Sequence, residues 1–173
     1  MTIIFKAMCN NDIPLWNAWI KNPHVANTWF LDGYEIADYI CQKIEGNGYD
    51  YPFIAYLAAK PIAYIQCSDL YAYRTKCPAP KGVFTKEEPG TYCIDLFIGD
   101  EQNLNKGYGT LIIKAFIDYI FKNFAAEAIL IDPAASNTHA IHCYEKAGFS
   151  FVKKAFDSVT ECYVMQCRKK HGD

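Results

Sequence analysis

The chain lacks a long apolar run, an excess of positive charge and any pair of cysteines at the spacing of a zinc knuckle. No window approaches the about 18 uninterrupted apolar residues of a membrane helix, because Lys114 and Asp118 interrupt the most apolar stretch. Seventeen Lys and Arg against 19 Asp and Glu give a net charge of −2, which offers no basic field to a nucleic-acid backbone. We therefore expect neither a membrane span nor nucleic-acid binding.

The eight cysteines do not indicate a disulfide framework, since a chain of 173 residues can bury a core without such links. We expect them to be thiols without a shared role, and we expect no metal site. The first six residues carry neither a basic leader nor a sustained apolar segment, so no secretory signal is expected. The expected location is the cytoplasm.

A packed core is what the composition favours. Hydrophobic residues make up 51% and aromatic residues 16% of the chain, far more than a disordered chain carries. The length suits one core and not two, so residues 1–173 are expected to form a single domain.

Strands and helices are expected to alternate along the chain. Aromatic and β-branched runs predict strands at Thr2–Ala7, Tyr51–Ala58, Ile62–Cys67, Tyr92–Ile98, Ala128–Ile131, Phe149–Lys154 and Cys162–Cys167. Apolar spacing predicts helices at Ile13–Ile20, at Ile36–Ile44 with Asp32 as cap, at Gly107–Phe121 and at Asn137–Ala147. Residues 24–29 are expected to be irregular and Leu70–Gly90 to form a long loop. The order β-α-α-β-β-β-α-β-α-β-β predicts an α/β fold, a mixed and mostly antiparallel sheet flanked by helices.

A glycine-containing turn, Asn103-Leu-Asn-Lys-Gly-Tyr-Gly-Thr110, lies between a strand and the strongest helix. Successive backbone N–H groups at a helix N-terminus form a site for phosphate, and Gly107 and Gly109 let a ligand approach the backbone closely. The alternative is an ordinary turn, because a lone G-x-G is a weak signal.

A second segment carries polar groups on and beside one helix. Asp132 follows a strand, where open α/β sheets present ligand groups. Asn137 and Tyr144 then lie on one face of the next helix. Taken alone, Tyr144 is equally well a packing aromatic.

The two segments together resemble the GNAT superfamily of acetyl-CoA-dependent N-acetyltransferases. The resemblance rests on Lys-Gly-Tyr-Gly-Thr followed about thirty residues later by Asn-x-x-Ala-x-x-x-Tyr-Glu-Lys-Ala-Gly-Phe, and on Tyr-Cys-Ile-Asp-Leu-Phe-Ile-Gly before them. Within that superfamily the sequence is most similar to the aminoglycoside 6'-N-acetyltransferases, continuously from Tyr51 to Phe149. Leu104 stands where the superfamily's turn usually begins with Gln or Arg.

The resemblance implies a role for each of these residues. Acetyl-CoA would contact Leu96, Ile98, Leu104, Asn105, Lys106, Gly107, Tyr108, Gly109, Thr110, Asn137 and Tyr144. Tyr144 would protonate the departing thiolate, and Asp95 would be the base or the amine anchor. Asp132 and Trp29 would contact the amine. On periodicity alone, Asp95 is a residue of a solvent-facing strand surface.

Acidic residues suggest a cationic substrate. Five acids and no Lys or Arg lie between Glu87 and Glu101, and among them Glu87 and Glu88 would form a rim that attracts an amine. The alternative is a solvated acidic loop.

Three functions remain open. The first is acetylation of the 6'-amine of an aminoglycoside antibiotic, which confers resistance. The second is acetylation of an endogenous amine such as a polyamine, a siderophore amine or a protein N-terminus. The third, a non-catalytic acyl-CoA-binding domain, is disfavoured because Asp95, Asn137 and Tyr144 are all present. The sequence leaves the oligomeric state open.

Overall fold

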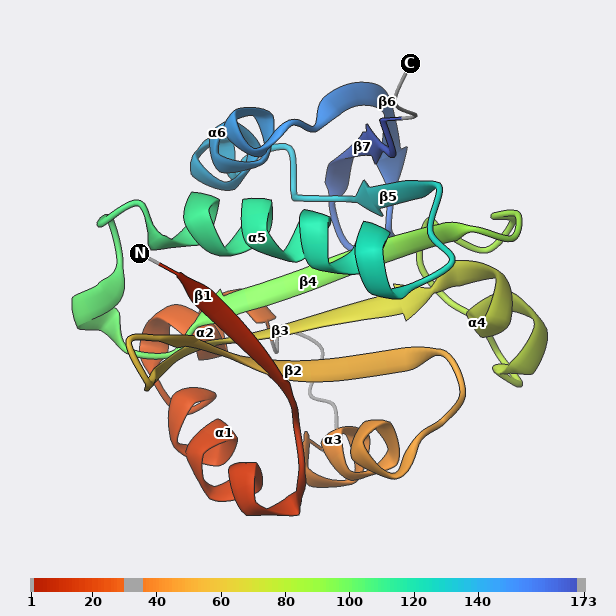
Figure 1. The fold of residues 1–173 in the computed structure, drawn as a ribbon. Coiled ribbons are helices and arrows are strands. Elements are labelled where there is room, and N and C mark those ends of the chain that lie inside the picture. Colours follow the sequence, from red (N-terminus) through yellow and green to blue (C-terminus); the bar gives the residue numbers. More distant parts are fainter. Residues whose placement is uncertain (1, 30–35, 171–173) are drawn as a thin grey trace.

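One mixed sheet runs through the molecule. The computed structural model describes residues 2–29 and 36–170. The strands are β1 (Ile3–Ala7), β2 (Asp50–Leu57), β3 (Lys60–Asp69), β4 (Thr91–Ile98), β5 (Ala128–Ile131), β6 (Ser150–Phe156) and β7 (Glu161–Arg168). They lie in the order β1-β2-β3-β4-β5-β7-β6, and every neighbouring pair is antiparallel except β4 and β5 (Figure 1).

Helices cover both faces of this sheet. They are α1 (Ile13–Trp19), α2 (Pro23–Trp29), α3 (Ile36–Glu45), α4 (Leu70–Lys76), α5 (Tyr108–Asn123) and α6 (Thr138–Ala147), with short 3-10 turns η1 (Asn10–Asp12) and η2 (Glu101–Asn103). Figure 1 shows α5 and α6 on one side and α1 to α3 on the other. The α/β architecture is therefore the one that the sequence predicts.

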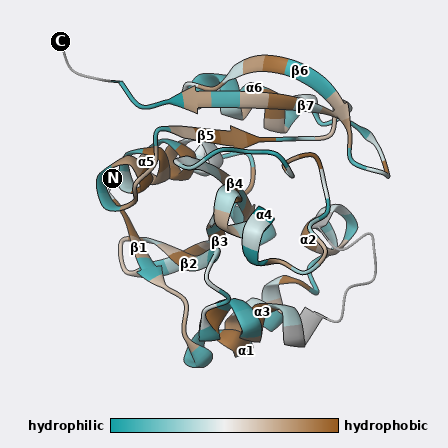
Figure 2. Ribbon diagram, turned by 90° about the vertical axis from the view of Figure 1, so that its right-hand side faces the viewer, coloured by the Kyte–Doolittle hydropathy of each residue, from teal (hydrophilic) through white to brown (hydrophobic). Residues whose placement is uncertain are grey.

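The alternation of side chains along β3 explains how both faces are covered. Ile65 and Cys67 point into the core under α5, which also contains the fully buried Phe116. Tyr64 points the other way, into a second core with Trp16 of α1. β3 thus lies in the middle of the molecule, and Figure 2 shows the hydrophobic colour on α5 and α1, which pack against the sheet.

The sheet opens between β4 and β5. These strands pair only where Thr91–Cys93 meets Ala128–Leu130. β5 ends at Ile131, whereas β4 continues to Ile98 on β3. Beyond this point the edge of β4 that β5 does not cover lines a groove.

Two helices were not expected from the sequence. Residues 24–29 form most of α2 instead of an irregular segment, because Pro23 begins this helix at its first position, where no N–H is needed. The Asn22 carbonyl accepts from the N–H groups of Val25 and Ala26. Asp32, the expected cap of α3, lies outside the described residues.

The segment Leu70–Gly90 is also more ordered than expected, since it opens with α4. The Asp69 carboxylate caps this helix by accepting from the N–H of Ala72 at 2.9 Å, and the buried Leu70 anchors its first turn. The prediction of a structureless loop is therefore wrong for residues 70–76.

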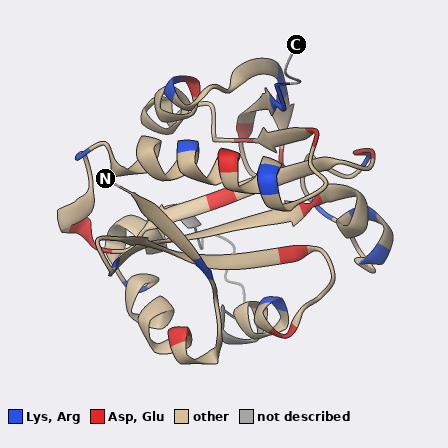
Figure 3. Cartoon of the chain, viewed as in Figure 1, with Lys and Arg blue, Asp and Glu red and all other residues tan. Residues whose placement is uncertain are grey.

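The charged residues are interspersed, and blue and red segments alternate over the ribbon in Figure 3. No helix in the described ranges is long and apolar enough to cross a membrane. All eight cysteines are free thiols. Within the described residues no group of three or more His, Cys, Asp or Glu side chains could hold a metal ion.

Candidate active site

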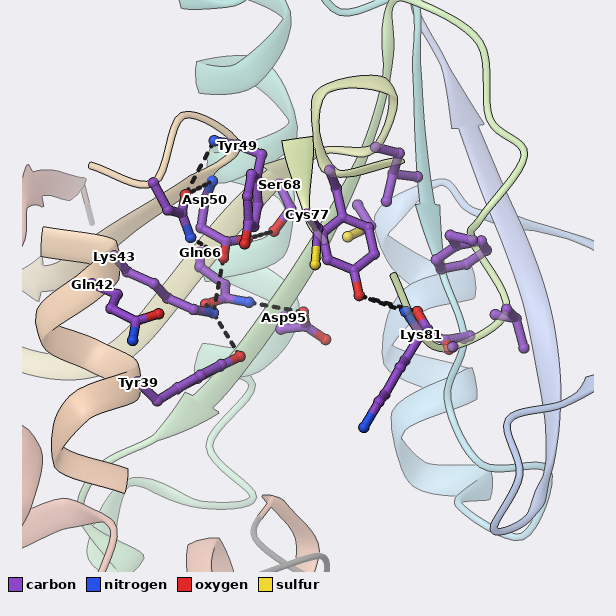
Figure 4. Close-up of a pocket in the computed structure, with 18 of the residues that line it drawn as sticks. Tyr39, Gln42, Lys43, Tyr49, Asp50, Gln66, Ser68, Cys77, Lys81 and Asp95 are labelled. Carbon is purple, nitrogen blue, oxygen red and sulfur yellow. Dashed lines mark hydrogen bonds and ion pairs between the residues drawn. The ribbon is translucent and has the colours of Figure 1, made fainter. Parts of the chain in front are cut away.

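Two cavities meet at Asp95 and Asp132, which line both. The first, of about 450 Å³, lies in the opening of the sheet and is called the β4–β5 groove. Its wall includes Leu96, Leu104 and Gly109. The second, of about 490 Å³, lies between α3, α4 and the loop after α4 and is called the α3–α4 pocket (Figure 4). Two ligands could therefore reach the same pair of carboxylates from different sides.

The predicted phosphate turn lies at one end of the β4–β5 groove. Gly107, the N-cap of α5, has a left-handed backbone with φ of 78°, and Asn105 has a φ of 58°. This geometry turns the chain sharply into α5, whose first N–H groups have no partner within the helix. A Cβ added at Gly109 would meet no atom within 4 Å. The turn thus leaves space beside N–H donors, which fits a pyrophosphate.

The backbone of β4 forms one side of the groove. Gly99 donates its N–H to the carbonyl of Ile62 in β3. Alternate residues of β4 therefore bond to β3, and the backbone N–H and C=O groups of the residues between them point away from β3. Leu96 and Ile98 are among those that face the groove, and both line it. His24 of α2 approaches the same edge, with Nε2 donating to the carbonyl of Ile98 at 2.8 Å. The acetyl-CoA that the sequence analysis expects would lie along this edge of β4.

Tyr144 projects from α6 into the groove. Its ring packs edge-on against Phe149 at a centroid distance of 5.7 Å, so it also contributes to the core. Burial, and then the charges of Asp95 and Asp132, raise the pKa of the Tyr144 phenol. The phenol is therefore protonated at neutral pH and can donate a proton.

Asn137 is the N-cap of α6, and this limits how it can bind a ligand. Its Oδ1 accepts from the N–H of Ala140 at 3.1 Å. The acceptor end of the amide is thus engaged in the cap, and the side-chain NH₂ is the group available to a ligand in the groove.

Asp95 lies in the middle of β4, on the sheet face that carries α3. The carboxylate accepts a hydrogen bond from Gln66 Nε2 at 3.1 Å. Its pKa is raised by burial, an effect that the charge of Lys43 and the bond from Gln66 oppose. The strand face that periodicity assigned to solvent is therefore the wall of a cavity.

Asp132 follows β5 and faces Asp95 across the opening of the sheet. Burial, together with the charges of Asp95 and Asp157, raises the pKa of Asp132 to about 7. No ion pair to Asp95 or Asp132 is found within residues 2–29 and 36–170. Two carboxylates to which no side chain in these ranges is ion-paired are suited to hold an ammonium group.

The expected acidic rim is not assembled. Glu87 and Glu88 are not among the residues that line either cavity, and Glu88 pairs instead with Arg74 at 3.6 Å. The five acids are separated because β4 runs between the two ends of their window, so Glu101 lies at its far end. Trp29 ends α2, and its side chain lies outside what the structure describes.

Sequence reasoning missed several polar residues of the α3–α4 pocket, among them Lys43, Asp50, Gln66 and Ser68. Gln66 and Ser68 are buried polar residues of an otherwise apolar strand, and Gln66 is the cross-strand partner of Asp95. A lone polar residue in each of two adjacent apolar strands was the available signal. It becomes readable only when the register of the two strands is known.

The comparisons with known proteins agree with this geometry. The model of the acetyltransferase (GNAT) domain family matches residues 9–156. The chain belongs to this family. The match, together with the relatives described next, indicates that the chain is an acyltransferase.

Similar proteins include antibiotic-modifying enzymes. An aminoglycoside N(6')-acetyltransferase type 1 of Klebsiella pneumoniae is 28% identical over 154 residues, which cover 86% of this chain and 74% of that protein. A structure of AAC(6')-Ib with paromomycin and acetyl-CoA aligns with a TM-score of 0.85 at 25% identity, covering 98% and 94% of the two chains. A spermine/spermidine N(1)-acetyltransferase of Bacillus subtilis is 32% identical over 62 residues, 36% of this chain and 41% of that one.

Proposed function

We propose that this protein transfers the acetyl group of acetyl-CoA to the 6'-amine of an aminoglycoside. The observation that carries the proposal is the meeting of the β4–β5 groove and the α3–α4 pocket at Asp95 and Asp132. One cavity has the donors that a pyrophosphate needs, and the other has carboxylates for a cationic acceptor.

The β4–β5 groove would hold acetyl-CoA, which supplies an acetyl group activated as a thioester. The N–H groups from Leu104 to Thr110 bind the pyrophosphate, while Leu96 and Ile98 align the extended arm along β4. The side-chain NH₂ of Asn137 donates to the same arm. These contacts bring the thioester to the end of the groove that Asp95, Asp132 and Tyr144 share.

Asp95 and Asp132 would hold the substrate as an ammonium ion and then accept its proton. The free amine attacks the acetyl carbon, so a C–N bond forms as the C–S bond breaks. Tyr144 gives its proton to the leaving sulfur, and the second proton, which the acetylated nitrogen loses, returns to the phenolate through solvent. The raised pKa of Tyr144 favours the protonated phenol before the reaction.

The dimensions of the α3–α4 pocket support an aminoglycoside as the acceptor. A cavity of about 490 Å³ accommodates more than one sugar ring. The relatives named above as aminoglycoside acetyltransferases cover most of the chain, whereas the polyamine enzyme covers 36% of it. Acetylation of a polyamine is the second candidate.

A panel assay separates the two candidates. Release of the CoA thiol is measured with kanamycin, ribostamycin, spermine and spermidine, and the acetylated nitrogen is assigned by NMR. We expect kcat/KM for the aminoglycosides to exceed that for the polyamines by about tenfold or more, with acetylation at the 6'-nitrogen. Preference for spermidine, or acetylation at another position, would refute the proposal.

Replacing Asp95 by Asn tests the acceptor side of the site. The variant keeps the shape and removes the charge, so KM for the amine should rise and kcat should fall together, by about 100-fold in kcat/KM. Glu45→Gln, which neutralises an exposed acid of α3, is the matched control and should do neither. Wild-type kinetics in Asp95→Asn would move the base to Asp132 or to a bound water.

The cytoplasmic location remains a prediction, supported by the use of acetyl-CoA, which is an intracellular metabolite. Contact between Trp29 and the substrate also remains a prediction.

A further inference from the structure

A buried amide connects Asp95 to the interior of the protein. Gln66 is 4% exposed, and it lies directly opposite Asp95 in the pairing of β3 with β4. Its Nε2 donates to Asp95 Oδ2 at 3.1 Å. Gln66 touches the carboxylate that the proposed function requires, from the side opposite the β4–β5 groove.

The orientation of this amide is fixed by two donors. Gln66 Oε1 accepts from Lys43 Nζ at 2.6 Å and from the hydroxyl of Tyr64 at 2.7 Å. An ammonium group can only donate, so the oxygen of the amide must face Lys43 and its NH₂ must face Asp95. A flipped amide would lose these bonds and present an oxygen to the Asp95 carboxylate.

Lys43 is itself immobilised. Its side chain is 2% exposed, and Nζ donates to the Tyr39 hydroxyl at 2.6 Å and lies 3.6 Å from Asp50 Oδ2. Asp50 is held in turn by a hydrogen bond from the Ser68 hydroxyl. Figure 4 shows Lys43, Gln66 and Asp95 in a row that leads from α3 across β3 to β4. The positive charge is therefore fixed in the wall of the pocket, and little of the side chain is open to a substrate.

The charged and titratable groups around Asp95 come from several elements, and Lys81 of the loop after α4 lines the α3–α4 pocket with it. Lys43 of α3 favours its ionised form, whereas Asp50 of β2 and Asp132 after β5 disfavour it. The phenol of Tyr144 on α6 faces it from the groove. The fixed cation and the bond from Gln66 thus oppose burial and two like charges.

We propose that Gln66 is a positioning residue for Asp95 and that Lys43, acting through Gln66 and through its charge, keeps this carboxylate ionised at neutral pH. The inference rests on the proposed function for its effect on catalysis. The protonation state of Asp95 itself does not depend on which reaction the protein catalyses.

The test uses Lys43→Met, which keeps the aliphatic chain and removes the charge, and Gln66→Glu, which keeps the acceptor for Lys43 and removes the donor to Asp95. The titration of the Asp95 side-chain carboxyl is followed by ¹³C NMR in the full chain. We expect its midpoint to move to higher pH in both variants. In assays at pH 7, kcat should fall about 10- to 100-fold and recover at higher pH, while affinity for CoA stays within about twofold.

Two further variants keep the test decisive. Gln66→Met removes the hydrogen bonds without adding a charge, and it should also raise the midpoint of the Asp95 titration. It replaces Gln66→Glu in the test if that variant does not fold. Lys122→Met removes an exposed lysine of α5 and should leave the midpoint unchanged. An unchanged Asp95 midpoint in Lys43→Met, or a loss of kcat that is equal at every pH, would overturn the proposal.

The NMR titration requires no acetyl transfer. If the wild-type protein acetylates no amine of the panel while the midpoint of Asp95 still moves, the proposed function fails and the network stands. If aminoglycosides are acetylated and the midpoint stays constant, the network fails and the function stands.

Discussion

At the level of single residues, deprotonation of the amine and protonation of the leaving thiolate depend on groups whose pKa is set by burial. Asp95, Asp132 and Tyr144 are drawn into one region from three elements, and the pKa of each is raised. For a phenol this favours the proton donor, and for a carboxylate it favours the uncharged form. Desolvation therefore keeps Tyr144 protonated but makes its phenol a weaker acid, and at Asp95 it must be opposed.

Tyr144→Phe separates catalysis from packing. The change removes the hydroxyl and keeps the ring that packs against Phe149. If the phenol protonates the thiolate, kcat should fall by about 100-fold or more, with the affinity for CoA nearly unchanged. Kinetics with kanamycin and calorimetry with CoA measure the two quantities. Wild-type turnover would leave Tyr144 with a packing role alone.

Some of these residues could be predicted from the sequence and others could not. Asp95, Asp132 and Tyr144 stand out because each belongs to a local motif or follows a strand. Gln66 is a polar residue in an apolar strand, but nothing in the sequence pairs it with Lys43, which lies 23 positions away. Their contact depends on the packing of α3 on the sheet, which the local sequence does not encode.

At the scale of elements, the turn into α5 can be tested without disturbing the fold. Gly109 has no left-handed backbone, and an added Cβ meets no protein atom, so Gly109→Val should leave the thermal midpoint nearly unchanged. The valine methyl groups would instead occupy the space beside the N–H donors. Affinity for CoA should fall by roughly tenfold or more in calorimetry.

Gly109→Ala is the matched control for that variant and should have a smaller effect. Gly107 is a poorer position, because its φ of 78° makes any side chain strained whether or not a ligand binds there. Unchanged CoA affinity in Gly109→Val would exclude the turn as the pyrophosphate site.

Gly99 has a structural role, because the absence of a side chain there lets α1 approach the end of β4. A Cβ at this position would lie 2.1 Å from Trp19 Cε2, and Trp19 is 3% exposed. Gly99→Ala should therefore destabilise the fold by about 1–3 kcal/mol through overpacking, measured by urea unfolding. Adding Trp19→Phe, which shortens the ring, should cost less in the Gly99→Ala background than in the wild type. Equal costs in both backgrounds would show that the two residues do not clash.

The elements themselves show where local signals suffice. β5 has the predicted bounds, Ala128–Ile131, because a short apolar run between turn residues predicts a buried strand in an α/β chain. α4 was missed because a helix of this length is set by one cap and one anchor, Asp69 and Leu70, followed by residues typical of a loop. Pro23 begins a helix where the sequence predicted an irregular segment. Caps and prolines near a boundary have two readings, and tertiary contacts select one.

At the scale of the whole molecule, the net charge of −2 says little about the site, because the acids gather there from separate parts of the chain. Asp50, Asp95 and Asp132 come from β2, β4 and the end of β5, and Lys43, which pairs with Asp50, and Lys81 line the same pocket. More acids than lysines therefore line this pocket. Attraction of a cationic substrate should weaken as salt screens it.

Ionisation of Asp132 should therefore raise activity and lower the stability of the fold as the pH rises. With its pKa raised to about 7, this carboxyl is neutral below that pH and charged above it, so kcat/KM for kanamycin should rise as the pH passes from 6 to 8. In the unfolded chain the same group ionises at about pH 4, so its ionisation costs folding free energy progressively between about pH 4 and 7 and fully above. Asp132→Asn should therefore flatten the rise in kcat/KM and stabilise the fold more at pH 8 than at pH 5, as urea unfolding at the two pH values would show. A stability gain that is equal at both pH values would mean that Asp132 is not a desolvated carboxylate, and the acceptor site would then rest on Asp95 alone.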